Sequence, residues 1–223
     1  TAELIRPILR GRDIKRYGYN WTGLYLIATF PSRHYDIEKY PAVKNYLLGF
    51  GIERLEQTGK SHIVNGEKIK ARKKTNNKWF ETQDSISYWE DFSKPKIMYP
   101  NMTKYIPFYF DEKNFLQNDK SFMITGKHIA YLTAFLNSSI FKFCFLDKFP
   151  ELQGGTRELR KIFFDKIPVL KVSDKENEIF KSLVTDIQND YKKEKAILID
   201  ERLFELYGLS KEERISIGYI EIK

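Results

Sequence analysis

The sequence contains few of the residues that most often bind metals or act as nucleophiles. Its single cysteine, Cys144, cannot form a disulfide within the chain, so a reducing, cytoplasmic setting is predicted. Cys144 lies between two phenylalanines, which favours a packing role over a reactive thiol. The three histidines are far apart in the sequence and have no cysteine beside them. Because a metal site needs clustered ligands at suitable spacing, none is predicted.

Long apolar runs and known catalytic motifs are missing as well. No run of about 18 apolar residues is present, which predicts that no segment spans a membrane. The N-terminus lacks the layout of a signal peptide and does not begin with Met, so we expect a piece of a longer protein. The sequence also lacks a G-x-S-x-G elbow, a G-x-x-x-x-G-K-[ST] loop and the Asn- or Asp-Pro-Pro-aromatic signature of adenine methylation.

One nuclease-like pattern does occur at the end of the chain. Glu221-Ile222-Lys223 has the E-x-K shape, but no suitable acid precedes it, and chance explains it better. We therefore predict no catalytic residue, metal or cofactor in this chain and expect it to act by binding.

Basic side chains outnumber acidic ones and are unevenly distributed. The chain has 38 Lys and Arg against 30 Asp and Glu. Residues 1–170 hold 28 of the basic and 18 of the acidic residues, whereas residues 171–223 hold 10 and 12. The first region therefore has a net charge of +10 and the second −2. A positively charged body suits a polyanion such as nucleic acid, although many basic proteins bind none.

Hydrophobic periodicity indicates an α+β fold. Apolar, β-rich runs predict strands at "LYLIATF", "KPKIMYP", "YIPFYF" and "SFMIT", and Asn65-Gly66 predicts a hairpin. Helices are predicted from Pro41, over residues 126–147, and after Ser173 and Ser210, each of which has a Glu three positions later. We therefore predict a mixed or antiparallel β body with packed helices over residues 1–170 and a C-terminal helical extension over residues 171–223.

The segment "LQGGTRELRKIFF" combines a flexible turn with closely spaced basic residues. Its two glycines permit close approach of a nucleic-acid backbone, and Thr156 is a suitable N-cap for a helix that begins at Arg157. The three basic residues then share one face beside the positively polarised helix N-terminus. The predicted phosphate-binding residues here are Gly154, Gly155, Thr156, Arg157, Arg160 and Lys161. The alternative is a turn followed by a solvated amphipathic helix.

Two further basic segments are candidates for DNA contact. "GRDIKRYGY" interleaves basic residues with tyrosines, a pattern that can bind phosphate and stack on bases. Residues 68–78 form the most cationic stretch, and the forked Arg and Asn side chains there suit base edges. The predicted phosphate ligands of the first segment are Arg10, Arg12 and Lys15, and the predicted base-reading residues are Arg72, Lys74, Asn76, Asn77 and Lys104. A strand edge with stacked arginines and a mobile charged loop are the alternatives.

The order of several motifs resembles a known family. These motifs are "LIRPILRGRDIKRYGY", "KWFE", "FSKPKIMYPNMTKYIPFYFD", "AYLTAFLNSSIFKFCF", "LQGGTRELRKIFFDKIPV" and "IDERLFELYGLSKEE". Together they are similar to the TaqI-like C-terminal specificity domain, the target-recognition part of restriction–modification enzymes that methylate adenine. Related modules occur in Type I specificity subunits and in phage-defence methyltransferases. The resemblance covers nearly the whole chain.

The resemblance implies a role in sequence-specific binding of double-stranded DNA. It implies a methyltransferase domain in the same polypeptide, which would hold S-adenosylmethionine and the catalytic motif, with or without an endonuclease. DNA would lie between the two domains, and the target adenine would be flipped into the other one. The family's glycine-containing segment matches Gly154-Gly155 and the helix after it. Part of the specificity is expected in the variable middle of the chain, roughly residues 52–92.

Three other interpretations remain open at this point. The acidic helical extension could dock another protein, which would make the chain a protein-interaction module. The chain could also be part of a Type I-like specificity subunit without a fused methyltransferase. An RNA-modifying enzyme or a nuclease is the third alternative, and the lack of clustered acids weighs against it.

Overall fold

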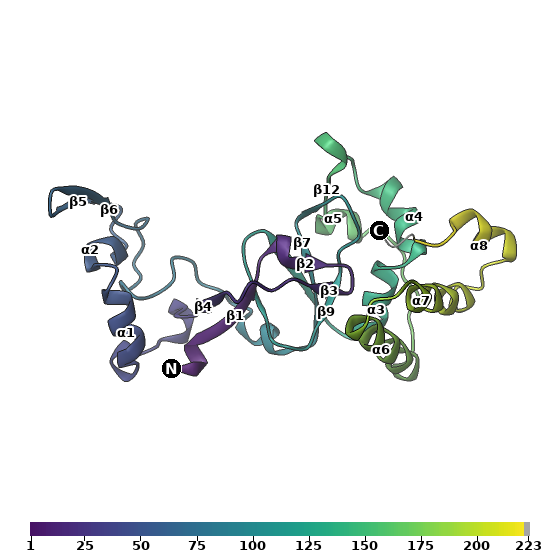
Figure 1. Cartoon of the computed structure of the whole chain (residues 1–223), viewed down its shortest axis with the longest axis horizontal. Coiled ribbons are helices and arrows are strands. Elements are labelled where there is room, and N and C mark those ends of the chain that lie inside the picture. The colour runs from purple at the N-terminus through teal and green to yellow at the C-terminus, as the bar shows by residue number, and fades with distance from the viewer. Residues whose placement is uncertain (221–223) are drawn as a thin grey trace. The chain divides into compact units, whose positions relative to one another are not determined.

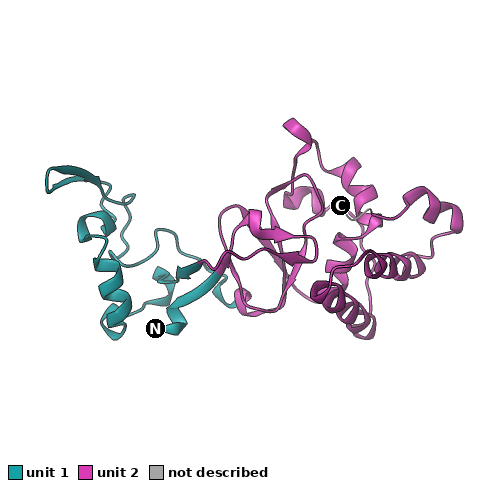
Figure 2. Cartoon of the chain, viewed as in Figure 1, with its two compact units in different colours: residues 1–7, 25–90 teal, residues 8–24, 91–223 magenta. Residues whose placement is uncertain are grey.

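The computed structural model describes residues 1–220 and divides into two compact units (Figures 1 and 2). Unit 1 comprises residues 1–7 and 25–90, and unit 2 comprises residues 8–24 and the chain from residue 91 onward. The E-x-K tripeptide at residues 221–223 lies outside the described residues. The small mixed and antiparallel sheets and the many helices confirm the predicted α+β class.

Unit 1 contains short helices and a hairpin around a small core. Its elements are η1 (Ala2–Leu4), the first part of β1 (Ile5–Leu9), β4 (Tyr25–Ile27), η3 (Pro31–Arg33), η4 (Ile37–Lys39), α1 (Pro41–Leu48), α2 (Ile52–Leu55), β5 (Ser61–Val64) and β6 (Glu67–Lys70). The core consists of Leu4, Ile37, Val43 and Phe80. Gly51 separates α1 from α2 with a φ of 85°, a left-handed conformation that suits glycine.

The predicted hairpin is present in unit 1. Asn65 and Gly66 have φ values of 51° and 83°, as a two-residue turn of the tight hairpin type requires. They join β5 to β6, which pair antiparallel from Val64 opposite Glu67 to Ser61 opposite Lys70. The sequence signal was sufficient because a hairpin turn of this kind depends on two adjacent residues alone.

Unit 2 holds the predicted central strands. β7 (Lys96–Pro100) lies between β11 (Ser121–Thr125) and β9 (Tyr109–Asp111) in an antiparallel sheet. Its other strands are the second part of β1, β2 (Ile14–Lys15), β3 (Gly18–Tyr19), β8 (Met102–Thr103), β10 (Leu116–Gln117) and β12 (Arg157–Glu158). The short helix η2 (Gly11–Asp13) precedes β2, and η5 (Trp89–Ser93) begins in unit 1 and ends in unit 2.

The helices of unit 2 pack around one large aromatic core. They are α3 (Ile129–Leu136), α4 (Ser139–Lys148), η6 (Gln153–Gly155), α5 (Lys161–Phe164), α6 (Asp174–Asn189), α7 (Lys193–Leu206) and α8 (Lys211–Ile217). Phe108, Phe135, Phe141 and Phe149 from the body lie in the same buried cluster as Phe180 and Phe204 from the C-terminal helices. The expected domain boundary at residue 170 stays a prediction, but both sides of it share this core.

Two helices replace the single helix predicted over residues 126–147. α3 ends at Leu136, and α4 begins after Ser138, whose hydroxyl accepts a hydrogen bond from the Phe141 amide at 3.1 Å. Between them, the Asn137 amide group donates to the Phe108 carbonyl at 2.8 Å. The two helix axes differ in direction by 68°. The long helix was a wrong prediction because Ser138 caps a new helix inside a continuous apolar pattern.

Among residues 1–220, no single helix has the length and apolar composition needed to cross a membrane. The bent pair α3–α4 meets that test only when both helices are counted together.

Candidate nucleic-acid interface

A groove in unit 2 collects basic side chains from distant parts of the sequence. Its volume is about 900 Å³, and its walls come from the η2–β2 region, the segment between Pro100 and Pro107, α4 and the C-terminal part of the chain. Six basic residues line it: Arg12, Lys15, Arg16, Lys104, Lys120 and Lys142. No acidic residue lines it within the described part of the chain. Such a one-sign groove favours a polyanionic ligand.

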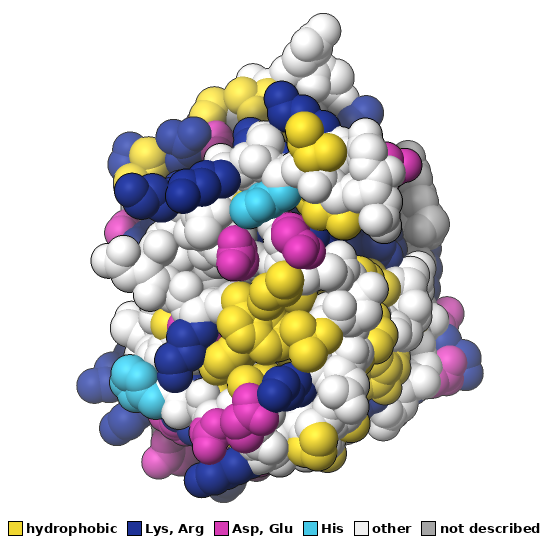
Figure 3. Space-filling model, turned by 90° about the vertical axis from the view of Figure 1, so that its left-hand side faces the viewer, with side chains coloured by type: hydrophobic (Ala, Val, Ile, Leu, Met, Phe, Trp, Pro, Cys, Tyr) yellow, Lys and Arg dark blue, Asp and Glu magenta, His cyan; other side chains and the backbone are white. Residues whose placement is uncertain are grey.

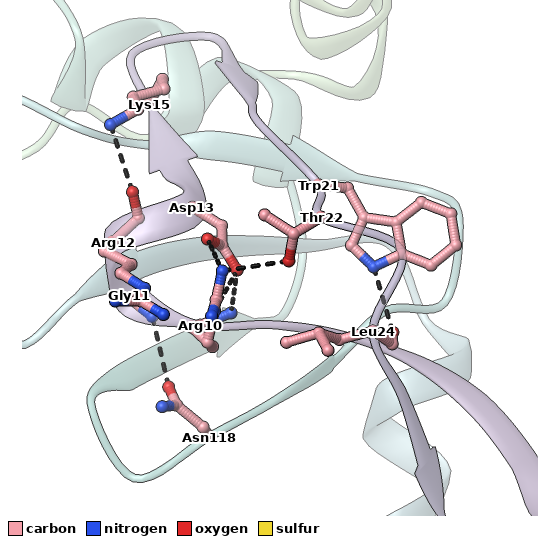
Figure 4. A network of polar contacts seen from close by, with 9 residues as sticks. All are labelled: Arg10, Gly11, Arg12, Asp13, Lys15, Trp21, Thr22, Leu24 and Asn118. Carbon is pink, nitrogen blue, oxygen red and sulfur yellow. Dashed lines mark hydrogen bonds and ion pairs between the residues drawn. The ribbon is translucent and has the colours of Figure 1, made fainter.

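The turn that presents Arg12 is fixed by a partly buried ion pair (Figure 4). The Arg10 guanidinium donates to both carboxylate oxygens of Asp13, at 2.9 Å from Nε and 2.8 Å from Nη2, and to the Thr22 hydroxyl at 3.0 Å. These hydrogen bonds from Arg10 hold the pKa of Asp13 below its ordinary value. Arg10 therefore supports the groove wall, while Arg12 between the two paired residues is exposed.

Gly11 lets this turn lie directly against the β10–β11 connection. A Cβ atom on Gly11 would lie 2.2 Å from the carbonyl oxygen of Lys120, which is far inside van der Waals contact. The Gly11 amide donates to Asn118 Oδ1 at 3.2 Å (Figure 4). Glycine is therefore required by the close approach of two backbones, and that approach brings Arg12 and Lys120 to one groove.

Arg16 is held by the junction between α3 and α4 and by the C-terminal part of the chain. Its Nη2 donates to the carbonyl of Asn137 at 2.7 Å, and its Nη1 donates to the hydroxyl of Tyr191 at 3.0 Å. Tyr191 and Ile220 also line the groove. The extension after residue 170 thus contributes both a wall of the groove and a partner that orients one of its cations.

Apolar and aromatic side chains lie among these cations. Tyr105 is 74% exposed and lines the groove together with Met102 and Leu146. The Thr103 hydroxyl accepts from the Tyr105 amide at 3.0 Å and donates to the Tyr105 carbonyl at 2.6 Å, which fixes this turn. Basic residues interleaved with exposed aromatics suit a ligand with both phosphates and flat bases.

The predicted glycine turn lies beside the groove, but the helix after it does not begin at Arg157. Gly154 and Gly155 have φ values of 74° and 78°, and a Cβ on Gly154 would lie 4.0 Å from Lys104 Nζ. Arg157 is in strand β12, opposite Thr103, and α5 begins only at Lys161. Thr156 is thus no N-cap, and its hydroxyl donates to the Gln153 carbonyl at 2.9 Å. The pairing with β8 is a long-range contact that local sequence cannot show.

The basic residues after this turn have partners inside the protein. The Arg157 side chain is 12% exposed, donates to the Phe149 carbonyl and contacts Glu151 Oε2 at 3.2 Å. Arg160 pairs with Glu158 at 2.8 Å, and Lys161 pairs with Asp165 at 2.6 Å. None of the three lines the groove. Their predicted phosphate contacts stay predictions, and the groove provides better placed cations.

Two of the predicted base-reading residues use their donors within unit 1. The Arg72 guanidinium donates to the carbonyls of Leu55 at 2.7 Å and Glu81 at 2.8 Å, and also to that of Trp79. Burial lowers the pKa of Arg72 below its ordinary value. The Asn77 amide donates to two carbonyls, at residues 82 and 83, both at 3.0 Å. Lys74 and Asn76 are exposed. Forked side chains suit backbone carbonyls as well as base edges, and composition cannot distinguish the two uses.

Sequence reasoning selected three groove residues and missed others. Arg12, Lys15 and Lys104 line the groove, and none of them makes an ion pair among residues 1–220. Lys120 and Lys142 were missed because neither belongs to a local cluster of basic residues. Only the tertiary fold brings them to Arg12 and Lys15.

Potential metal ligands and the single thiol give no support for a metal centre or a thiolate nucleophile among the described residues. No group of three or more potential metal ligands occurs among residues 1–220. Burial raises the pKa of the Cys144 thiol, which works against a reactive thiolate.

Comparison with known proteins identifies the family. No curated protein matches the chain. A family model, that of the TaqI-like C-terminal specificity domain, matches residues 6–169. The matched range includes the η2–β2 turn, β7 to β9, α3, α4 and the glycine turn, whereas α6 to α8 lie beyond it. The match spans about three quarters of the sequence, and the chain therefore belongs to the TaqI-like C-terminal specificity domain family.

Proposed function

We propose that this chain is the DNA target-recognition domain of a restriction–modification adenine methyltransferase. The basic groove of unit 2 is the observation that carries the proposal, and membership of the specificity-domain family supports it. The groove supplies cations for phosphates and exposed apolar side chains for bases or sugars. Double-stranded DNA is the ligand that combines these features with the family's role.

Affinity would come chiefly from the release of counterions from DNA. Each phosphate neutralised contributes about 0.9 to the slope of log affinity against log salt. If all six groove cations contact phosphates, the slope is about −5, and binding weakens by roughly three decades between about 50 and 200 mM salt. The sequence preference would come from other side chains that reach base edges.

The parent protein supplies the chemistry in this proposal. A methyltransferase domain of the same polypeptide would bind S-adenosylmethionine, and the target adenine would be flipped into it. No residue of this chain is assigned to S-adenosylmethionine. An endonuclease domain in the parent is a further part of the proposal, and a Type I-like specificity subunit is the alternative for a chain without a fused methyltransferase.

Salt-dependent binding of this chain to a labelled duplex of randomised sequence tests the proposal. Fluorescence anisotropy measures the slope for the wild type and for the triple variant Arg12→Ala/Lys15→Ala/Lys104→Ala. The variant is expected to lower the magnitude of the slope by about 3, close to one for each lysine or arginine that contacts phosphate. The triple variant Lys171→Ala/Lys175→Ala/Lys211→Ala removes three exposed lysines outside the groove and is the matched control.

Two outcomes contradict the proposal. A protein-interaction module would show no steep salt dependence with any duplex. An equal loss of affinity in the control and in the triple groove variant would mean that net charge, and not the groove, attracts the DNA.

A further inference from the structure

One face of the β5–β6 hairpin is basic and exposed. Ser61 lies opposite Lys70 and Ile63 lies opposite Lys68, so these four side chains share a face. All four are exposed, whereas His62, Val64 and Ile69 on the other face are half-buried. This alternation, which only Glu67 at the turn breaks, means that unit 1 covers one side of the hairpin and leaves the other to solvent.

The exposed face has no partner within the described chain. Ile63 is 80% exposed, the largest exposed fraction of any large apolar side chain among residues 1–220. Neither Lys68 nor Lys70 makes an ion pair in that range. Figure 3 looks onto unit 1 and shows several Lys and Arg side chains on this side of the molecule, some of them beside apolar ones. An apolar side chain beside two unpaired lysines suits an anionic surface that also presents apolar groups.

A fixed base supports the hairpin. The ladder continues beyond the strands through hydrogen bonds from the Ala71 amide to the Lys60 carbonyl and from the Gly59 amide to the Arg72 carbonyl, at 2.9 and 2.8 Å. On its buried side, this base is held by the three hydrogen bonds that the Arg72 guanidinium donates to backbone carbonyls. The buried Gln57 amide adds hydrogen bonds to the carbonyls of Lys78 and Glu81, at 3.0 and 2.8 Å. The hairpin therefore projects as a supported element, and Arg72 positions it.

We infer that this face enters the major groove of the target duplex and recognises part of its sequence. The inference rests on the proposed function. The major groove is about 12 Å wide and admits a two-stranded β-ribbon. Residues two apart on a strand are about 7 Å apart, close to the rise of two base pairs. The Ile63–Lys68 and Ser61–Lys70 pairs would thus contact neighbouring parts of a short sequence.

The side chains on this face have defined base preferences. An apolar side chain contacts the thymine C5-methyl group, and lysine donates to guanine O6 and N7. Ile63 is therefore assigned to a thymine, and Lys68 and Lys70 are assigned to guanines or adjacent phosphates. These residues replace Arg72 and Asn77 as base-reading residues, because those two donate to carbonyls of unit 1.

Selection from a randomised duplex library tests this assignment. The wild-type chain, Ile63→Ala and Lys68→Ala are each used to select bound sequences, and the base preference at each position is compared. Ile63→Ala is expected to lose about tenfold of discrimination at one thymine, and Lys68→Ala a similar factor at a nearby guanine, as expected for single base contacts. Ile63→Val, which keeps an apolar contact, is expected to retain the thymine preference.

Matched controls separate this effect from general loss of binding. Ile215→Ala removes an isoleucine that is 72% exposed on α8, and Lys211→Ala removes an exposed lysine there. Both are expected to select the same sequences as the wild type. Replacing the selected thymine with uracil removes only the methyl group. This change is expected to weaken wild-type binding and to leave binding by Ile63→Ala unchanged.

The possible failures are distinguishable. If the hairpin variants select the same sequences as the wild type, the inference about the hairpin is wrong and the proposed function stands. A change of preference in Lys74→Ala or Asn76→Ala alone would then place base recognition outside the hairpin. A wild-type chain that binds duplexes with salt dependence but no sequence preference overturns the inference and the recognition role of the chain, and leaves only duplex binding by the groove. A wild-type chain that binds no duplex overturns both.

Discussion

Replacing Lys96 with methionine is expected to destabilise unit 2 strongly. Lys96 in β7 lies opposite Asp111 in β9, and neither side chain has any exposed surface. The Lys96 ammonium contacts Asp111 Oδ2 at 2.5 Å and the Phe92 carbonyl at 2.8 Å. Asp111 also accepts hydrogen bonds from the amides of Lys113 and Phe115, at 2.9 and 3.0 Å. The pair thus links two strands and the turn after β9.

The magnitude follows from what remains after the substitution. Methionine fills a similar volume, so no large cavity forms, and Asp111 keeps its two amide donors. Its charge, however, is left in a site without solvent or cation, which costs about 3–5 kcal/mol. This is a large part of the roughly 5–15 kcal/mol that stabilises a typical domain. Lys96→Met/Asp111→Asn removes the unpaired charge and is expected to recover about 2 kcal/mol of the loss.

Urea denaturation followed by circular dichroism measures these losses, and hydrogen exchange of the β7 and β9 amides assigns them to unit 2. Lys94→Met is the matched control, because Lys94 pairs with Asp91 on the surface and its loss costs about 0.2–1 kcal/mol. A loss of unfolding free energy in Lys96→Met that is no larger than in the control would contradict this expectation. So would a double variant that is as unstable as the single one.

Two further predictions follow from buried groups of unit 2. Burial raises the pKa of Asp200 above its ordinary 3.8. Above about pH 4 the folded state therefore binds more protons than the unfolded state, and the free energy of unfolding falls as the pH rises. The stability of the wild type relative to Asp200→Asn should therefore decrease from pH 4 to pH 7 in paired urea titrations, and a constant difference would contradict this. Gly11→Ala places a methyl group against the Lys120 carbonyl. It should lower the free energy of unfolding by about 1–3 kcal/mol and also weaken DNA binding. Unchanged stability in thermal denaturation would show that the two backbones separate freely.

Local signals in the sequence predicted much of the fold. The turn at Asn65-Gly66 and the caps at Ser173 and Ser210 each depend on residues within one turn, and all three are present. The strands at residues 96–100 and 121–125 were also predicted, because short apolar runs between turn residues favour strands.

Features set by distant contacts were not predictable. The apolar pattern of residues 126–147 continues across the break at Asn137, which exists because its side chain bonds to the Phe108 backbone. A single helix over residues 126–147 would bury Phe143 on the same stripe as Leu136 and Ile140, but Phe143 is exposed on α4 after the bend. Arg157 begins no helix because it pairs with β8, far earlier in the chain.

The candidate site was predictable only in part for the same reason. Arg12 and Lys15 belong to a local basic cluster, which the sequence shows. Lys120 and Lys142 reach the same groove only through the fold. Arg72 has the chemistry of a base-reading residue, but the carbonyls around it use its donors, and no sequence pattern distinguishes the two uses.

The sharing of one aromatic core across residue 170 limits where this protein can be shortened. Helices α6 and α7 lie beyond the family match, yet Phe180, Val184 and Phe204 on them are completely buried with residues of α3 and α4. A version cut at residue 169 lacks α6 and α7, so the apolar side chains of α3 and α4 that these helices cover would be exposed to water, and Arg16 would lose Tyr191. Such a product is expected to aggregate, so a soluble minimal version must retain α6 and α7 at least.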